Sequence, residues 1–329
     1  MGEGASSKYL GVLVGKGQKA FNQHCVNMVS KLNKCAGLML SILRGIMNPC
    51  TILPKLWNIY MLPRVLYGAE VVPIKPHVVD DLEVAQKGFI KNVFRWMRST
   101  SDVACYLIGG VRRVQDTIIK CKMGYYQYVA AQDDVRWSKQ AFYEQWAWGV
   151  LEGIIDDTGV ILVDKVPTAQ PFWFKEVVQF YRILGHHKLV TQTKTDVRML
   201  LDLRHQRFIE KERKDHTSIK YMDNPWDMVD HDFRRGYHMW WQKARVGSLF
   251  LGYRNPVRPS CPLCNAEVET LDHFLDGCQE YSFRAPDSFR LDVDATWALS
   301  VERSFEERAL IDRLIRARWK ERKEKLDRR

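Results

Sequence analysis

One short segment near the carboxyl end of the chain carries residue types that bind metal ions. It reads SCPLCNAEVETLDHFLDGCQ from Ser260 to Gln279 and holds three of the eight cysteines. Cys261, Cys264, His273 and Cys278 follow a Cys-x2-Cys-x8-His-x4-Cys spacing. Three thiolates and an imidazole suit tetrahedral Zn²⁺, and four protein ligands leave no open position for water. The spacing therefore predicts a structural Zn²⁺ site rather than a catalytic one.

The residues around this set are expected to support a metal site. Pro262 favours a tight bend in which backbone N–H groups point at sulfur, and Leu271, Phe274 and Leu275 are spaced to form a short helix with an apolar core. Such a small module buries little apolar area, so metal binding would supply folding energy. A redox role for Cys-x-x-Cys is the alternative, but the strand–helix context of thioredoxin-like proteins is missing.

Composition indicates a globular protein without membrane segments. The chain has 329 residues, of which 46% are hydrophobic and 27% charged, and a net charge of +11. No secretory signal is visible, and no run approaches the roughly 18 apolar residues of a spanning helix. The remaining cysteines are scattered singly, as expected in a reducing compartment, at positions 25, 35, 50, 105 and 121. We expect an intracellular protein, in the nucleus or the cytoplasm, with no membrane partner.

Hydrophobic periodicity predicts a mostly α-helical fold. Helical patterns cover residues 20–43, 77–97, 112–131, 174–184 and 195–214. A further helix is expected to begin near Pro54 and to kink at Pro63. The texture changes to short apolar runs between Gly149 and Pro171, which predicts a domain boundary there.

The last segment is rich in both charged and apolar residues. Lys and Arg outnumber Asp and Glu from Arg303 onward, and apolar residues recur at helical spacing at Leu310, Ile311, Leu314, Ile315 and Trp319. This pattern predicts an amphipathic helix that docks one face and leaves a basic face outside. That basic face is either a solvated surface or a phosphate-contacting one.

The metal-binding segment resembles the C-terminal zinc-binding region of non-LTR (LINE-like) retrotransposon reverse transcriptases. That family's pattern is Cys-Pro-x-Cys, an acidic spacer, His-Phe-Leu and a further Cys, as in CPLCNAEVETLDHFLDGCQEYSFRA here. The family often has Gly after the second Cys, where this chain has Asn265, which also tolerates a left-handed turn. Three more segments resemble the family in the right order: KYLGVLVGKG, LPRVLYGAEVVPI and STSDVACYLIGG. The resemblance is weak over residues 150–230.

The resemblance implies an order of domains. Residues 1–110 would form a thumb-like helical bundle, 111–236 a helical connector, 237–290 the small zinc-binding module and 291–329 the basic amphipathic helix. The thumb would cradle a primer–template duplex and the zinc region would grip template RNA or target DNA. The expected partners are therefore RNA, DNA or both, with no small-molecule substrate.

The family's polymerase site is expected to be absent from this chain. That site is an aromatic-x-Asp-Asp hairpin whose carboxylates hold two Mg²⁺ ions, and it should precede Lys8. The segment GIIDDTGVILV, residues 153–163, imitates such a hairpin but follows the thumb-like region. Asp-Thr-Gly between apolar runs is also typical of an ordinary turn. We therefore expect no catalytic residues and no polymerase activity.

Cations near the zinc-binding module are the candidate nucleic-acid contacts. Lys243, Arg245, Arg254 and Arg258 would contact phosphates. Aromatic residues lie between these cations in the sequence, and they are Trp240, Trp241 and Tyr253. They could stack on unpaired bases or belong to the core. The alternative hypothesis is a zinc-stabilised helical scaffold that binds protein, in which the positive charge only aids solubility. Salt dependence of binding separates the two hypotheses.

Overall fold

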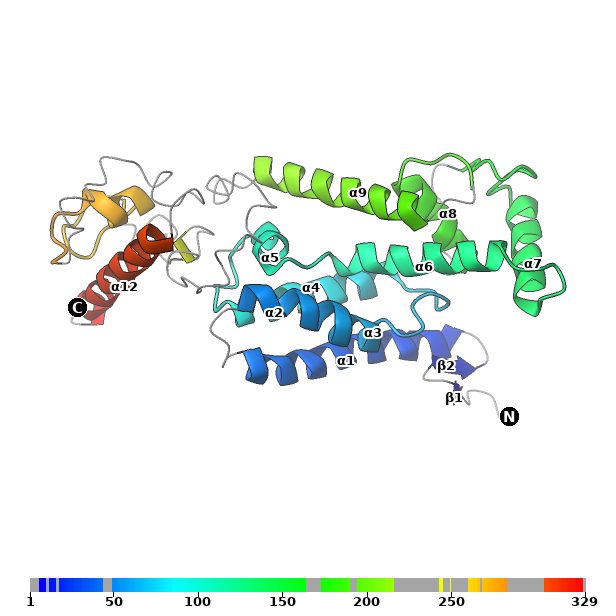
Figure 1. The fold of residues 1–329 in the computed structure, drawn as a ribbon, viewed down its shortest axis with the longest axis horizontal. Coiled ribbons are helices and arrows are strands. Elements are labelled where there is room, and N and C mark those ends of the chain that lie inside the picture. The colour runs from blue at the N-terminus through cyan, green and yellow to red at the C-terminus, as the bar shows by residue number, and fades with distance from the viewer. Residues whose placement is uncertain are drawn as a thin grey trace. The chain divides into compact units, whose positions relative to one another are not determined.

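The computed structural model shows a mostly helical chain, which confirms the predicted fold class (Figure 1). It describes residues 6–9, 12–15, 18–43, 49–163, 173–189, 194–215, 243–244, 249, 260–266, 268–282 and 305–327.

The chain forms two compact units. The first contains Met1–Met39, Leu56–Gln86 and Arg112–Glu210. The second contains Leu40–Lys55, Lys87–Val111 and Lys211–Arg329. The domain boundaries after residues 110, 236 and 290 stay predictions.

The first described elements are a β-hairpin and a long helix. Strands β1 (Ser6–Tyr9) and β2 (Val12–Gly15) pair antiparallel, and helix α1 (Gln18–Leu43) follows them. The buried apolar residues of α1 recur at helical spacing and are Cys25, Met28, Leu32, Met39 and Leu43. The periodicity of residues 20–43 thus predicted both the helix and its buried face.

Two prolines shape the next helical stretch, which begins earlier than predicted. Helix α2 (Pro49–Leu56) starts at Pro49, so the predicted start near Pro54 is wrong and Pro54 lies inside the helix. A π-turn (Trp57–Met61) then precedes α3 (Leu62–Val65), and the Leu62 N–H donates to the Trp57 carbonyl. Pro63 has no N–H and its ring would clash with the carbonyl four residues earlier. The irregularity expected at Pro63 therefore takes the form of a π-turn.

Helices α4 (Pro76–Val93) and α5 (Asp102–Gly109) are linked by two ion pairs. Asp102 in the first turn of α5 accepts hydrogen bonds from Lys87 at 2.7 Å and Lys91 at 2.8 Å. Partial burial acts to raise the pKa of Asp102, but the two lysines outweigh it, so the pKa is lowered. Gly110 ends α5 at φ 61, a left-handed conformation that favours glycine.

One apolar core joins the helices of the first unit that follow. Buried side chains of α6 (Val114–Ala130), α7 (Trp137–Leu151) and α8 (Trp173–Ile183) pack together with Ile154 and Ile155. Val197 and Leu201 of α9 (Lys194–Asp215) belong to the same core. Residues on both sides of 149–171 thus share one core, so the domain boundary predicted there is wrong.

A buried ion pair lies within the first unit. The Lys122 ammonium is 2.8 Å from the Glu176 carboxylate and donates to the Val72 carbonyl at 2.7 Å. Glu176 also accepts a hydrogen bond from the Ile74 N–H at 2.8 Å. Burial lowers the pKa of Lys122 and raises the pKa of Glu176, because each charge has lost its water. Each charge is therefore stable only while the other is present.

The second unit contains the cysteine segment and the last helix, α12 (Phe305–Asp327). No helix among the described residues is long and apolar enough to cross a membrane.

Candidate metal centre

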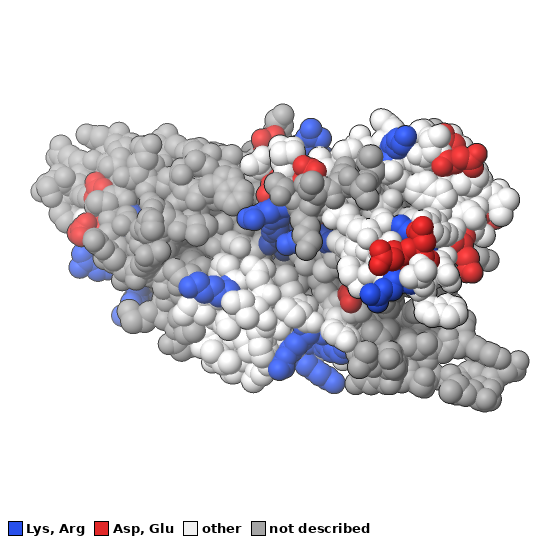
Figure 2. All heavy atoms as spheres, turned by 45° about the vertical axis from the view of Figure 1, so that its right-hand side comes forward, with Lys and Arg blue, Asp and Glu red and all other residues white. Residues whose placement is uncertain are grey.

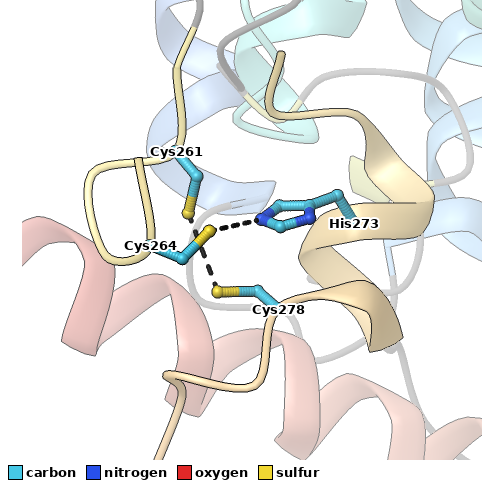
Figure 3. A group of neighbouring side chains, drawn as sticks. All are labelled: Cys261, Cys264, His273 and Cys278. Atoms are coloured by element: carbon cyan, nitrogen blue, oxygen red, sulfur yellow. Dashed lines mark hydrogen bonds between the residues drawn. The ribbon is translucent and has the colours of Figure 1, made fainter. Parts of the chain in front are cut away.

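The four predicted ligand residues lie together in the structure. Their ligand atoms are all within 4.8 Å of one another, and Figure 3 shows the side chains pointing at a common centre. The Cys261 and Cys278 sulfurs are 3.8 Å apart, and the Cys264 sulfur is 3.3 Å from His273 Nε2. All three cysteines are free thiols. The arrangement could therefore hold a metal ion.

These separations fit four-coordinate geometry. With metal–sulfur bonds of about 2.3 Å and metal–nitrogen bonds of about 2.0 Å, a tetrahedron places its sulfurs about 3.8 Å apart and sulfur about 3.5 Å from nitrogen. The two separations of 3.8 and 3.3 Å are close to these values. The side chains need no large rearrangement to surround one ion.

A tight turn positions the first two cysteines. The Asn265 N–H donates to the Cys261 carbonyl, and the Cys261 N–H donates to the Ala266 carbonyl, each at 3.0 Å. Asn265 lies at φ 61, so the left-handed turn predicted for it is confirmed. The backbone N–H groups of Cys264 and Leu263 lower the pKa of Cys261, against the larger effect of burial. The expected bend with N–H groups aimed at sulfur is thus present.

The three thiols differ in their surroundings. Burial raises the pKa of Cys261, and it raises the pKa of Cys278 to about 12. At the exposed Cys264, desolvation also acts to raise the pKa. The Ala266 N–H and the neighbouring thiols outweigh it and lower the pKa of Cys264. Holding all three as thiolates in so small a space requires a cation among them.

A π-turn positions the other two ligands. Residues His273–Gly277 form one turn in which the Cys278 N–H donates to the His273 carbonyl at 2.8 Å. Residues five apart in an α-helix lie about 140° from each other around the axis, at 3.6 residues per turn. The wider i→i+5 turn instead brings Cys278 back beneath His273, so both can face one ion. Figure 3 shows these side chains leaving the two ends of the turn.

The predicted small core is also present. Leu271, Phe274 and Leu275 are buried, and Phe274 is completely so. The Phe274 ring packs edge-on against Tyr281 at 5.6 Å and against Trp319 of α12 at 6.2 Å between ring centroids. The core of the metal-binding segment, residues 260–282, therefore includes a side chain of the last helix.

Two arginines of α12 attach that helix to the metal-binding segment. Arg318 donates to the carbonyls of Phe274 and Leu275, which lie in the π-turn between two ligands. Arg322 makes a bidentate pair with Glu269 at 2.7 to 3.0 Å. Both arginines are almost fully buried and Glu269 is fully buried. These cations hold the fold together and are not available to a ligand.

The apolar side of α12 is buried, as its periodicity predicted. Ile311, Leu314 and Ile315 are at most 2% exposed. Near the other end, Glu321 accepts hydrogen bonds from the N–H and hydroxyl of Ser282 at 2.8 to 3.1 Å. Sequence reasoning missed Glu269, Arg318, Arg322 and Glu321, because no local pattern links residues this far apart in the chain.

Only one of the predicted phosphate contacts lies in the described part of the chain. Lys243 is half-buried, and its burial together with the nearby Arg95 guanidinium lowers its pKa. The other predicted contacts lie outside the described residues, and they are Arg245, Arg254, Arg258, Trp240, Trp241 and Tyr253. The interface stays a prediction.

The segment that imitates a polymerase hairpin contains an ordinary turn. Ile155 and Ile161 form an antiparallel bridge, and Asp156 lies between them. Its Oδ1 accepts hydrogen bonds from the Thr158 and Val160 N–H groups and the Thr158 hydroxyl. The Val160 N–H, and then Thr158, lower the pKa of Asp156. The carboxylate thus closes its own loop.

The charged side chains of the described residues are not gathered in one place on the face drawn in Figure 2. Lys and Arg side chains of the described residues form several separate groups there, and Asp and Glu gather mainly toward the right-hand side of the view. Net charge alone therefore does not locate a binding surface.

Comparisons of this chain with known protein families, with curated proteins and with solved structures find no match.

Proposed function

We propose that this chain is a zinc-containing nucleic-acid-binding protein related to the non-LTR retrotransposon reverse transcriptases. The observation that carries the proposal is the set of four converging ligand atoms at Cys261, Cys264, His273 and Cys278. Thiolate and imidazole donors with tetrahedral spacing favour Zn²⁺ over harder cations, which prefer oxygen ligands. A site closed by four protein ligands is structural.

Zn²⁺ would act here as a cross-link. It would join the tight turn that carries Cys261 and Cys264 to the π-turn that carries His273 and Cys278. The protein supplies the rest of the module, because Arg318 binds the carbonyls of the π-turn and Arg322 neutralises Glu269. Metal binding would thereby stabilise the contact with α12 as well as the two turns.

Nucleic-acid binding is supported by charge and by the family resemblance. The chain has a net charge of +11, and Arg254 and Arg258 directly precede the first ligand in sequence. A metal that fixes the turn at Cys261 would hold such cations near one another and allow them to contact one strand. Lys243 belongs to the same unit and would add a further cation.

We expect the full chain to bind RNA or DNA in a salt-dependent way with little sequence preference. Fluorescence anisotropy with a labelled single strand, from about 50 to about 200 mM salt, should give a linear fall of log K with log salt. Arg254→Glu/Arg258→Glu should weaken binding to all sequences and flatten the slope by about 1.4, at roughly 0.7 per phosphate contact. Removal of zinc with a chelator should weaken binding similarly.

A matched control is Lys120→Glu/Arg198→Glu, which changes two cations at exposed positions of the first unit, outside the thumb-like residues 1–110. This variant should bind like the wild type. Absence of binding by the wild type at about 50 mM salt, where electrostatic association is strong, would rule out the proposed function.

The protein-binding scaffold remains the second candidate, and one observation favours it. Two large apolar side chains around the start of α7 in the first unit are highly exposed, Val135 at 83% and Trp137 at 87%. Exposed apolar patches mark protein contacts. If this hypothesis is right, the chain will bind no nucleic acid in the salt series above.

A further inference from the structure

We infer that the exposed face of α12 receives the phosphate backbone of a nucleic-acid strand, beside the metal-binding segment. This inference rests on the proposed function and assigns that function to a particular surface. From the sequence alone, the basic face of this helix could be either a solvated surface or one that contacts phosphates.

The cations of α12 divide into two groups. Arg308, Arg318 and Arg322 are buried, and two of them hold the metal-binding segment through Glu269 and the π-turn carbonyls. The remaining cations of this helix are exposed, and they are Arg313, Arg316, Lys320, Lys323 and Lys325. The helix thus uses one set of charges for folding and presents another to solvent.

Four of the exposed cations form a continuous row. Arg313, Arg316, Lys320 and Lys323 follow each other at spacings of three, four and three residues. At about 100° and 1.5 Å per residue, they occupy an arc of about 80° and a length of about 15 Å. We call these four residues the cationic row. Lys325 lies on another side of the helix.

The row lies opposite the packed face of the helix. Ile311, Leu314, Ile315, Arg318 and Arg322 are buried on the other side. Among the described residues, the only ion pair of the row joins Lys320 to Glu324 at 3.8 Å, and both side chains are more than half exposed. Such an exposed pair contributes little and would yield to a phosphate.

This arrangement favours a nucleic-acid strand over an anionic membrane. An interfacial membrane helix inserts an apolar face beside its basic face. The apolar face of α12 is occupied by its own packing, so the exposed face offers the cationic row and a few carboxylates, such as Glu324, but no apolar surface for insertion. The narrow row suits the regular phosphates of one backbone strand, with cations about 4.5 to 6 Å apart along the axis.

The row is also coupled to the metal-binding segment. Arg318 and Arg322 of the same helix bind Phe274, Leu275 and Glu269, so the orientation of the row depends on a folded segment. The metal would thus control binding by holding α12 in place, without contacting the nucleic acid.

The test is the full chain with Arg313→Gln/Arg316→Gln/Lys320→Gln/Lys323→Gln, a set that removes the charge and keeps a good helix former. Binding to a fluorescein-labelled single-stranded RNA should weaken on the order of 100-fold at about 100 mM salt, and the salt slope should fall by about 3, at roughly 0.7 per contact. DNA of the same sequence should show the same change, because the phosphates are shared.

A matched variant distinguishes the row from net charge. Lys120→Gln/Arg136→Gln/Arg198→Gln/Arg207→Gln removes the same charge from exposed positions of the first unit, outside the thumb-like residues 1–110, and should keep the wild-type slope. If the fourfold row variant loses metal, Lys320→Gln/Lys323→Gln alone should still lower the slope by about 1.4.

Four results would overturn the inference, and the last of them also removes the proposed function. If the wild type binds and the row variants keep the same salt slope, the cationic row does not contact phosphates, although the proposed function would stand. A loss confined to RNA or to DNA would exclude phosphate contact, and row-dependent binding to phosphatidylserine vesicles without an effect on RNA would assign the row to membranes. No binding by the wild type would remove the proposed function itself.

Discussion

A Cys278→Ser variant is expected to lose its metal and the protection of two separate segments from hydrogen exchange. Changes in residues that merely support metal ligands cost roughly 10- to 100-fold in affinity, so loss of one of four direct ligands should cost more than about 100-fold. The π-turn then loses its anchor, and Arg318 loses the carbonyls of Phe274 and Leu275. Hydrogen-exchange mass spectrometry should show faster exchange in residues 268–282 and in α12.

The first unit provides the internal comparison for this variant. Helices α6 and α8 belong to a separate unit with its own core, so their exchange should not change. Cys35→Ser is the matched control, because Cys35 is a half-buried thiol outside the ligand set. Unchanged protection of α12 in Cys278→Ser would mean that the metal does not hold this helix.

Lys122→Ala is expected to destabilise the first unit by about 3–5 kcal/mol, the usual cost of leaving one member of a buried ion pair alone. The Glu176 carboxylate would keep its hydrogen bond from Ile74 but lose its counter-ion inside the core. Urea unfolding followed by circular dichroism measures this loss. Lys120→Ala, at an exposed position on the same helix, should change stability by less than about 0.5 kcal/mol.

The double variant Lys122→Met/Glu176→Leu shows what the pair contributes. Replacing both charges removes the cost of burying them, although the Val72 carbonyl and the Ile74 N–H lose their partners. The double variant should therefore be more stable than Lys122→Ala. A double variant as unstable as the single one would show that an uncompensated charge is not the main cost.

The metal-binding segment could be read closely from the sequence because its determinants are local. The ligand spacing, the left-handed conformation of Asn265 and the buried Phe274 all depend on residues within one short segment. The π-turn was not predicted. Its wider geometry depends on one backbone hydrogen bond, from Cys278 to His273, that leaves no mark on residue type.

The role of α12 could be predicted only in part. Periodicity predicted the apolar face at Ile311, Leu314 and Ile315. It also assigned all the arginines to the exposed basic face, without distinguishing the buried ones from the exposed ones. Arg322 is buried because Glu269 lies opposite it, and these residues are 53 positions apart in the chain. Pairing over such a distance is a property of the packed structure and not of a local pattern.

In the region around 149–171, the local sequence pattern led to a wrong prediction. Short apolar runs and the Asp156 turn suggested a boundary, yet Ile154 and Ile155 pack into the same core as Phe142 and Phe174. Helix α7 was also missed. Its aromatic residues lie on several sides, with Trp137 87% exposed and Phe142 buried, so no single apolar face marks the helix.

The most direct test of this account is the metal content of the purified full chain. Elemental analysis should find about one zinc ion per chain, held by Cys261, Cys264, His273 and Cys278, and much less in Cys264→Ser. Replacement of zinc by cobalt should give the visible absorption of a tetrahedral site with thiolate ligands. A wild-type chain without metal, or a Cys264→Ser variant with the same metal content as the wild type, would contradict the account.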